Sequence, residues 1–427
     1  MILVRNGRVI DPKTKRDEAV DLVIKDGKIH RIGKYHGGED YEQVIDASGK
    51  IVAPGLIDVH AHFRDPGSTY KETVETGAAA AKRGGYTTIV CMANTKPPID
   101  SPEAIHSTRE KGKRTGIRIL QAACVTKGMK GQELVDMAEL QRAGAVGFTD
   151  DGMPLLDTKM THEAMVLAKK LGTVLSFHEE DPALIDKAGV NKGKVSEELG
   201  FPGASASAED VMVARDCMLA LATGARVNIQ HVSSRNAVEL IRLTKRLGAD
   251  IWAEATPHHF SLTEEAVKKY GVNAKMNPPL RTNADRFAII EGLKDDTLEL
   301  IATDHAPHAQ EEKDKGLLEA PSGIIGLETA LALGNTYLVR KGHLTLMKLL
   351  GKMTYKPAYM YGLEQGSIRL DGPADLVIFD PNEGWVVGED FASKSKNSPF
   401  IGEKLYGKVK YTICAGQVVY QDGPAED

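Results

Sequence analysis

Cysteine is scarce in this sequence of 427 residues, and the four cysteines that occur are scattered along it. They form no CxxC pair, which argues against a disulfide framework and against a cysteine-rich metal site. Three of them lie in apolar runs, where a small buried side chain is the expected role. We therefore expect a chain without disulfides in a reducing, cytoplasmic environment. The four residues are Cys91, Cys124, Cys217 and Cys414.

Long apolar runs and blocks of like charge are also missing. No run of 18 apolar residues occurs, and residues 1–20 contain no apolar segment of the kind that signal peptides carry. The net charge is only −5, the charges are interspersed, and no lysine and arginine cluster alternates with aromatic residues. The sequence thus predicts neither a membrane protein nor a nucleic-acid-binding protein.

The two ends of the chain share one pattern. Residues 1–50 and 366–427 contain short β-like runs separated by turn residues. Among these, the pairs Asn6-Gly7 and Asp26-Gly27 predict hairpins. Because neither end is long enough to bury a sheet face alone, we expect the two ends to form one small β-sandwich.

The middle of the chain, residues 51–365, has a different pattern. Short apolar runs alternate with longer amphipathic stretches, which is typical of parallel βα units. A chain of this length suits one large barrel joined to a smaller domain, and eight candidate strands predict a (β/α)₈ barrel. The polar segment 305–323 follows the last strand and would lie over the barrel mouth, either as a mobile lid or as an ordinary loop. The candidate strands are residues 51–62, 86–93, 117–125, 145–150, 173–178, 226–232, 251–256 and 298–305.

Histidine and aspartate residues end five of these predicted strands. The first strand ends in His60 and His62, which project to the same face because they are two positions apart. The fourth ends in Asp150 and Asp151, of which only one should point into the barrel mouth. Catalytic residues of such barrels lie at the C-terminal ends of the strands, so we expect these side chains to meet. The fifth, sixth and eighth strands end in His178, His231 and Asp304.

Such a cluster predicts a metal centre, because buried imidazoles and carboxylates are costly unless they are paired or bind metal. Nitrogen and oxygen ligands without thiolates suit catalytic zinc with open coordination positions. A carboxylate that bridges two ions would give a binuclear centre that activates water at neutral pH. Asp304 lies where a carboxylate can accept a proton as general base and return it as general acid. The residues alone leave open whether one or two ions bind.

Seven motifs together resemble the dihydroorotase branch of the amidohydrolase superfamily. They occur in the family's order and spacing over nearly the whole chain. The resemblance implies reversible interconversion of N-carbamoyl-L-aspartate and L-dihydroorotate in de novo pyrimidine biosynthesis. The motifs are PGLIDVHAHFRDPG, MANTKPPID, FTDDG, HEED, QHVSS, MNPPLR and ATDHAPH.

The resemblance also implies roles for individual residues. Asp151 would bridge two zinc ions, although one ion is also conceivable, and Asp304 would act as the catalytic proton shuttle. Arg64 would hold the substrate carboxylate, for which a guanidinium fork is well suited. The implied zinc ligands are His60, His62, Asp151, His178, His231 and Asp304. The implied substrate-binding residues are His62, Arg64, Asn94, Asn277, His308, Ser322 and Gly323.

The sequence departs from the family pattern in two places. Many superfamily members bridge their metals with a carboxylated lysine, but the fourth strand ends in AVGFTDDG and has no lysine there. This matches a subset of bacterial dihydroorotases with aspartate at that position. The segment over the barrel mouth has Ser322 where a bulky apolar residue is expected, so Ser322 and Gly323 would contact substrate through their backbone.

Two other functions compete with this interpretation. Another cyclic amidase, an allantoinase or hydantoinase, would share the barrel and the metals, but Arg64 and ATDHAPH favour dihydroorotate. A non-catalytic partner of aspartate transcarbamoylase would lack metal ligands, whereas every ligand position is filled here. The resemblance allows a homodimer and an association with aspartate transcarbamoylase, and the residues decide neither.

Overall fold

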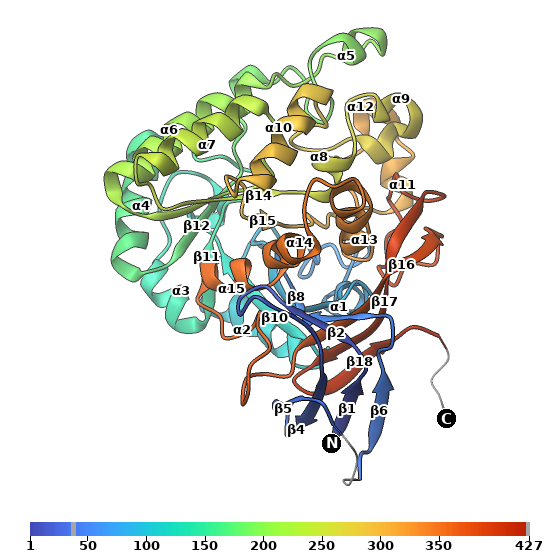
Figure 1. Ribbon diagram of the computed structural model, residues 1–427. Helices are drawn as coiled ribbons and strands as arrows, with labels where there is room; N and C mark the ends of the chain where they lie inside the picture. The colour runs from blue at the N-terminus through green and yellow to red at the C-terminus, as the bar shows by residue number, and fades with distance from the viewer. Residues whose placement is uncertain (36–39, 424–427) are drawn as a thin grey trace.

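The computed structural model describes residues 1–35 and 40–423, and its centre is a barrel of eight parallel strands (Figure 1). Each strand pairs with the next one along the chain, from β8 to β15. A parallel bridge between Ala61 and His305 joins the first strand to the end of the last, so the barrel is nearly closed. The predicted (β/α)₈ barrel is confirmed. The strands are β8 (Leu56–Ala61), β9 (Tyr86–Cys91), β10 (Arg118–Ala123), β11 (Ala145–Phe148), β12 (Val174–Phe177), β13 (Arg226–Ile229), β14 (Ile251–Ala255) and β15 (Leu300–Ile301).

Helices between the strands cover the outside of the barrel (Figure 1). Several begin at a serine, threonine or aspartate whose side chain accepts a backbone N–H of the first turn, as Thr73, Ser101 and Asp157 do. The longer helices are α1 (Val74–Arg83), α2 (Pro102–Gly112), α3 (Met137–Ala143), α4 (Thr158–Leu171), α6 (Ser207–Thr223), α7 (Arg235–Arg246), α10 (Asn283–Lys294), α14 (Leu346–Met353) and α15 (Tyr355–Tyr361). The shorter ones are α5 (Lys194–Glu198), α8 (Pro257–Ser261), α9 (Ala266–Tyr270), α11 (Gln310–Lys313), α12 (Gly316–Glu319) and α13 (Ala330–Gly334).

The two ends of the chain form the predicted sandwich of two sheets. One sheet has the order β5-β4-β1-β6, and the other has the order β18-β17-β16-β7-β2-β3, which mixes strands from both ends. Leu22 and Ile24 of the first sheet are buried in one apolar cluster with Val52, Leu376 and Ile378 of the second. The strands are β1 (Ile2–Arg5), β2 (Arg8–Asp11), β3 (Arg16–Ala19), β4 (Asp21–Lys25), β5 (Lys28–Gly33), β6 (Gln43–Asp46), β7 (Ile51–Pro54), β16 (Leu376–Val386), β17 (Lys404–Cys414) and β18 (Gln417–Gln421). The domain boundaries at residues 50 and 365 stay a prediction.

Two local expectations were wrong. Residues 51–62 form two strands instead of one, since β7 pairs in the sandwich and β8 in the barrel. Gly55 separates them, and a Cβ at this position would clash with Thr87. The pair Asn6-Gly7 connects strands of different sheets and makes no hairpin, because β1 pairs with β4 and β6 while β2 pairs with β3 and β7. The pair Asp26-Gly27 does turn the β4–β5 hairpin, and both of its residues have positive φ.

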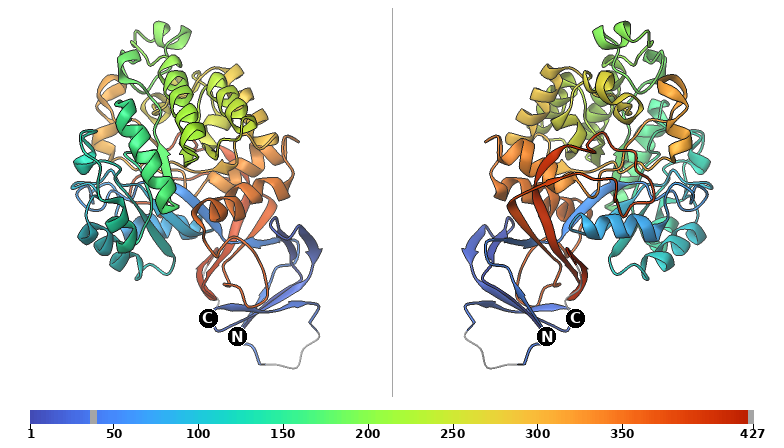
Figure 2. Two further views of the ribbon diagram at one scale, coloured as in Figure 1. Left: turned by 90° about the vertical axis from the view of Figure 1, so that its left-hand side faces the viewer. Right: turned by 90° about the vertical axis from the view of Figure 1, so that its right-hand side faces the viewer.

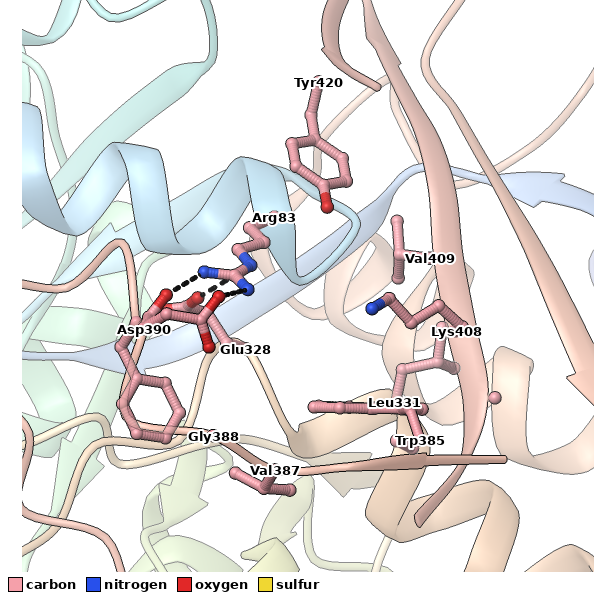
Figure 3. Close-up of a pocket in the computed structure, with 13 residues that line it drawn as sticks. Arg83, Glu328, Leu331, Trp385, Val387, Gly388, Asp390, Lys408, Val409 and Tyr420 are labelled. Atoms are coloured by element: carbon pink, nitrogen blue, oxygen red, sulfur yellow. Dashed lines mark hydrogen bonds and ion pairs between the residues drawn. The ribbon is translucent and has the colours of Figure 1, made fainter. Parts of the chain in front are cut away.

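The connection between β16 and β17 leaves the sandwich and packs against the barrel (Figure 2). Beside it lies a pocket in which the Arg83 side chain, at the end of α1, faces two carboxylates (Figure 3). Its Nη2 lies 2.7 Å from Asp390 Oδ2, and its Nε lies 3.4 Å from Glu328 Oε2. Leu331 and Val409 are among the apolar residues that line the rest of the pocket. The ion pair between Arg83 and Asp390 therefore attaches the connection between β16 and β17 to the barrel.

All four cysteines are buried free thiols, and burial was expected for the three that lie in apolar runs. Within residues 1–35 and 40–423, no helix is both long enough and apolar enough to cross a membrane.

Candidate active site

The two histidines of the first barrel strand face the aspartates of the fourth and eighth. Nε2 of His60 lies 3.6 Å from Asp151 Oδ1 and 3.3 Å from Asp304 Oδ1. Nε2 of His62 lies 3.4 Å from Asp151 Oδ2 and 3.0 Å from Asp304 Oδ1. The spacing of two positions thus places both imidazoles on the same side of the strand, facing one pair of carboxylates.

The other two histidines approach Asp151 from the fifth and sixth strands. Its Oδ1 lies 3.7 Å from His178 Nδ1 and 3.8 Å from His231 Nε2, and these two nitrogens are 3.0 Å apart. Asp151 therefore lies between two pairs of imidazoles. A carboxylate in this position is suited to ligate two ions at once.

The donor atoms present fit a divalent metal ion. Nε2 of His60 is buried and has no hydrogen-bond partner among the described residues, although it faces two carboxylates. A buried polar atom without a partner is costly unless a ligand satisfies it. Three overlapping groups each place three ligand atoms within 4.8 Å of one another. The groups are His60, His62 and Asp151; His60, His231 and Asp304; and Asp151, His178 and His231.

Acceptors outside the cluster hold the far nitrogens of two imidazoles. Glu254 Oε2 lies 2.9 Å from His60 Nδ1, and Glu180 Oε2 lies 3.0 Å from His178 Nε2. Such contacts fix the orientation of each ring, so that its other nitrogen faces the cluster. Sequence reasoning missed both residues. The signal for Glu254 was a charged residue inside a buried strand, and Glu180 lies in the HEED motif itself.

Asn94 connects two residues of the cluster directly. Its Oδ1 lies 2.9 Å from His62 Nδ1, and its Nδ2 donates to Asp151 Oδ2 at 3.2 Å. The side chain also lines the cavity next to the cluster, where the family resemblance places it as a substrate contact. Asn94 therefore orients two candidate ligands besides facing the cavity.

The adjacent aspartates of the fourth strand point to different surroundings. Asp150 Oδ1 accepts the backbone N–H of Val125 at 2.7 Å, and its Oδ2 accepts the hydroxyl of Thr126. Asp150 thereby fixes the loop after β10, while the carboxylate of Asp151 lies among the imidazoles. The structure thus places only Asp151 in the cluster.

The charges of the cluster hold its carboxylates ionised. Burial alone would raise the pKa of Asp151, but His60 and hydrogen bonds from His178 and His231 lower that pKa well below its usual range. For Asp304, burial is likewise outweighed, chiefly by His60, and its pKa is lowered. Ionised carboxylates are the form that binds a metal.

Three residues of the site have a left-handed backbone. The φ angles of Arg64, His231 and Asp304 are 57°, 33° and 48°, although none of them is glycine. Such conformations cost free energy and persist where the surrounding structure enforces them, which is frequent at functional sites.

A cavity opens beside the cluster, and every predicted substrate-binding residue lines it. Asn277 Oδ1 is buried there without a hydrogen-bond partner among the described residues. Gly152 and Ala306 also line the cavity, and sequence reasoning did not single them out. The predicted residues are His62, Arg64, Asn94, Asn277, His308, Ser322 and Gly323.

Arg64 and His308 form one side of this cavity. Arg64 donates from Nε to the Pro307 carbonyl at 3.2 Å, and its Nη2 lies 3.4 Å from His308 Nε2. His308 Nε2 lies 2.8 Å from the Ser322 carbonyl, and its Nδ1 lies 3.3 Å from Lys71 Nζ. Burial, reinforced by Arg64 and the nearby lysines, lowers the pKa of His308, so its imidazole is neutral. This side of the cavity therefore suits an anionic group.

The segment 305–323 contains the short helices α11 and α12 and is bound to the barrel. Lys313 is buried, and its Nζ donates to the carbonyls of Val272 at 3.0 Å and Pro321 at 2.8 Å. Lys275 Nζ donates to the Ala320 carbonyl at 2.7 Å. In this structure the two ends of the segment form part of the cavity wall. Its mobility as a lid stays a prediction.

A barrel with histidine and aspartate side chains gathered at the C-terminal ends of its strands is typical of the amidohydrolases. A family model described as Dihydro-orotase-like matches residues 49–237, and one described as Amidohydrolase family matches residues 321–420. A dihydroorotase of Clostridioides difficile is 60% identical over 98% of this chain and 100% of its own length. A dihydroorotase of Clostridium acetobutylicum is 53% identical over 99% of this chain and all of its own. The chain belongs to the dihydroorotase family, which confirms the resemblance of the motifs.

Solved structures of related amidohydrolases share the whole fold. An L-hydantoinase from Arthrobacter aurescens superposes with a TM-score of 0.88 at 26% identity, covering 100% of this chain and 97% of its own. A D-hydantoinase superposes with a TM-score of 0.86 at 25% identity, covering 98% and 95%. The sequence is therefore much closer to dihydroorotases than to these hydantoinases.

Proposed function

We propose that this chain is a zinc-dependent dihydroorotase that interconverts N-carbamoyl-L-aspartate and L-dihydroorotate in de novo pyrimidine biosynthesis. One observation carries the proposal: six candidate metal ligands converge next to the cavity that Arg64 lines, in a chain that is 60% identical to a dihydroorotase. A non-catalytic partner would not need this complete set. Hydantoinase or allantoinase activity is the second candidate, supported only by the shared fold.

Two zinc ions would bind on the two sides of Asp151. His60, His62 and Asp304 would hold one ion, and His178 and His231 would hold the other, with the Asp151 carboxylate between them. When bound, zinc would polarise the reacting carbonyl and lower the pKa of the attacking water. A single ion would use only one of the two pairs of imidazoles.

The side of the cavity that Arg64 and His308 form would orient the substrate. Arg64 would bind the carboxylate that dihydroorotate and carbamoyl aspartate have in common, because its guanidinium can pair with both carboxylate oxygens. Asn277 would accept a ring N–H through its unpartnered Oδ1. Held at both ends, the substrate would present its reacting carbonyl to the cluster, which reduces the entropic part of the barrier.

Asp304 would move the proton. Its carboxylate would take a proton from the attacking water and deliver it to the ring nitrogen as the ring opens. In the biosynthetic direction the same steps run backwards. We further propose a cytoplasmic homodimer, with aspartate transcarbamoylase as a candidate partner.

The test is zinc-dependent turnover of dihydroorotate, followed by ultraviolet absorbance, with metal content measured on the same sample. We expect activity that a chelator removes and zinc restores. Bound zinc without dihydroorotate turnover would contradict the proposal and lead to allantoin and hydantoins as substrates. Absence of both zinc and turnover would favour the non-catalytic partner.

A further inference from the structure

The connection between β16 and β17 reaches the cavity wall through one buried side chain, Asn397. Its Oδ1 accepts the backbone N–H of His308 at 3.1 Å. Its Nδ2 donates to the carbonyls of Ala306 at 3.0 Å and Gly323 at 3.1 Å. The carboxamide thereby uses both of its N–H donors and its oxygen, and a flipped amide would face each partner with the wrong group.

These contacts join the two ends of segment 306–323, which form part of the cavity wall. The chain leaves the barrel at Ala306 and returns at Gly323, and His308 and Ser322 between them line the cavity. The backbone carbonyl of Asn397 also accepts the N–H of Ile325 at 3.0 Å. Asn397, in the connection between β16 and β17, thus contacts both ends of segment 306–323.

The same connection is held in place independently of Asn397. Lys394 donates its backbone N–H to Glu72 Oε1 at 2.9 Å, and the Ser393 hydroxyl donates to the other oxygen of Glu72. Glu72 Oε2 also lies 3.1 Å from Nε2 of His305, the residue after Asp304. A change of the Asn397 side chain would therefore leave the connection attached to the barrel.

We propose that Asn397 is a positioning residue of the substrate site, which sets the places of His308 and Gly323 and through them the affinity for the substrate carboxylate. This inference rests on the proposed function. Lys275 and Lys313 still hold the middle of segment 306–323 without the carboxamide, but its two ends are held less firmly. Substrate binding must then restore the positions of His308 and Gly323, and that cost reduces ground-state and transition-state binding alike. Loss of uniform binding raises KM and leaves kcat nearly unchanged.

Two variants and one control test this role in the full-length, zinc-loaded protein. Asn397→Asp keeps the size of the side chain but places a carboxylate oxygen against the Ala306 and Gly323 carbonyls, and Asn397→Ala removes all three bonds. Ser398→Ala is the matched control, because Ser398 is equally buried and its hydroxyl accepts the N–H of the nearby Phe400. We expect KM for dihydroorotate to rise about tenfold in both Asn397 variants, with kcat within about threefold and zinc content unchanged. The control should keep the wild-type KM.

Hydrogen exchange of the substrate-free protein supplies a readout that does not depend on the reaction. Peptides covering residues 306–323 should exchange faster in both Asn397 variants than in the wild type and the control. Unchanged KM or unchanged exchange in both variants would overturn the proposal. Wild-type protein without dihydroorotate turnover would contradict the proposed function alone, since exchange would still test the positioning role. If both variants melt below the assay temperature, wild-type exchange decides: a protected His308 amide supports the proposal, and rapid exchange there overturns it.

Discussion

The barrel mouth and the Arg83 pocket of Figure 3 use charged side chains in opposite ways. In the pocket, Arg83 faces the carboxylates of Glu328 and Asp390, so each charge has a partner of opposite sign within the protein. At the mouth, four imidazoles surround two carboxylates, and the inward nitrogen of His60 has no hydrogen-bond partner among the described residues. The pocket is therefore complete as an internal contact, whereas the mouth is arranged around a ligand that must still bind.

The largest effect is expected for Asp151→Asn, which removes the carboxylate between the two pairs of imidazoles. Activity should fall to background, and zinc content should fall with it, because a neutral amide is a poor ligand. Zinc analysis and turnover measure this. Asp150→Asn is the matched control: it should keep zinc and activity but lose about 1–3 kcal/mol of stability, because Asp150 anchors Val125 and Thr126. Loss of zinc and activity in Asp150→Asn, with both kept in Asp151→Asn, would assign the metal-binding role to Asp150 instead.

Asp304→Asn should reduce kcat by about 10² to 10⁴, the usual range for loss of a general acid–base group. The expected loss comes from the missing proton transfer, so the comparison must be made at measured zinc content. Near-normal turnover with zinc still bound would contradict the shuttle role of Asp304.

Glu254→Gln should weaken zinc binding by about 10- to 100-fold, because the neutral amide holds the His60 imidazole less firmly. Competition with a chelator measures the affinity directly, and the melting temperature of the zinc-free protein shows whether the fold survives. Glu299→Gln changes a partly buried carboxylate, one paired with Lys245 away from the site, and should leave zinc affinity unchanged. Equal loss in both variants would mean a general effect on the fold.

Arg64→Lys should raise KM for dihydroorotate by about tenfold, since lysine keeps the charge but loses the paired hydrogen bonds to a carboxylate. Zinc content should not change. A KM equal to that of the wild type would remove Arg64 from the substrate site.

The smallest effect is expected for Asp390→Asn in the pocket of Figure 3, because this change leaves the pairing of Arg83 with the buried side chain of Glu328 in place. The Asp390 side chain is 80% exposed, so its ion pair with Arg83 contributes about 0–1 kcal/mol. Thermal unfolding should shift slightly, with kinetics unchanged. A large change of KM or zinc affinity would break the contrast between the two regions.

Regular patterns made much of this molecule predictable. The alternation of strands and helices predicted the barrel, and the spacing of His60 and His62 predicted a shared face. The choice between Asp150 and Asp151 needed tertiary structure, because it depends on donors from the preceding strand's loop. The Asn6-Gly7 pair showed where the chain turns but not which strands pair. Asn397 carried no local signal, because its partners around His308 lie far away in the sequence.

The shared sheet of the sandwich has a consequence for how the chain matures on the ribosome. Strand β7 pairs with β16, which is synthesised only after the entire barrel. At ordinary translation speeds the N-terminal strands therefore wait roughly tens of seconds with an unpaired edge, which is an opportunity for aggregation or chaperone binding. Asn397 emerges later still, so the wall of the substrate cavity is completed among the last events of folding.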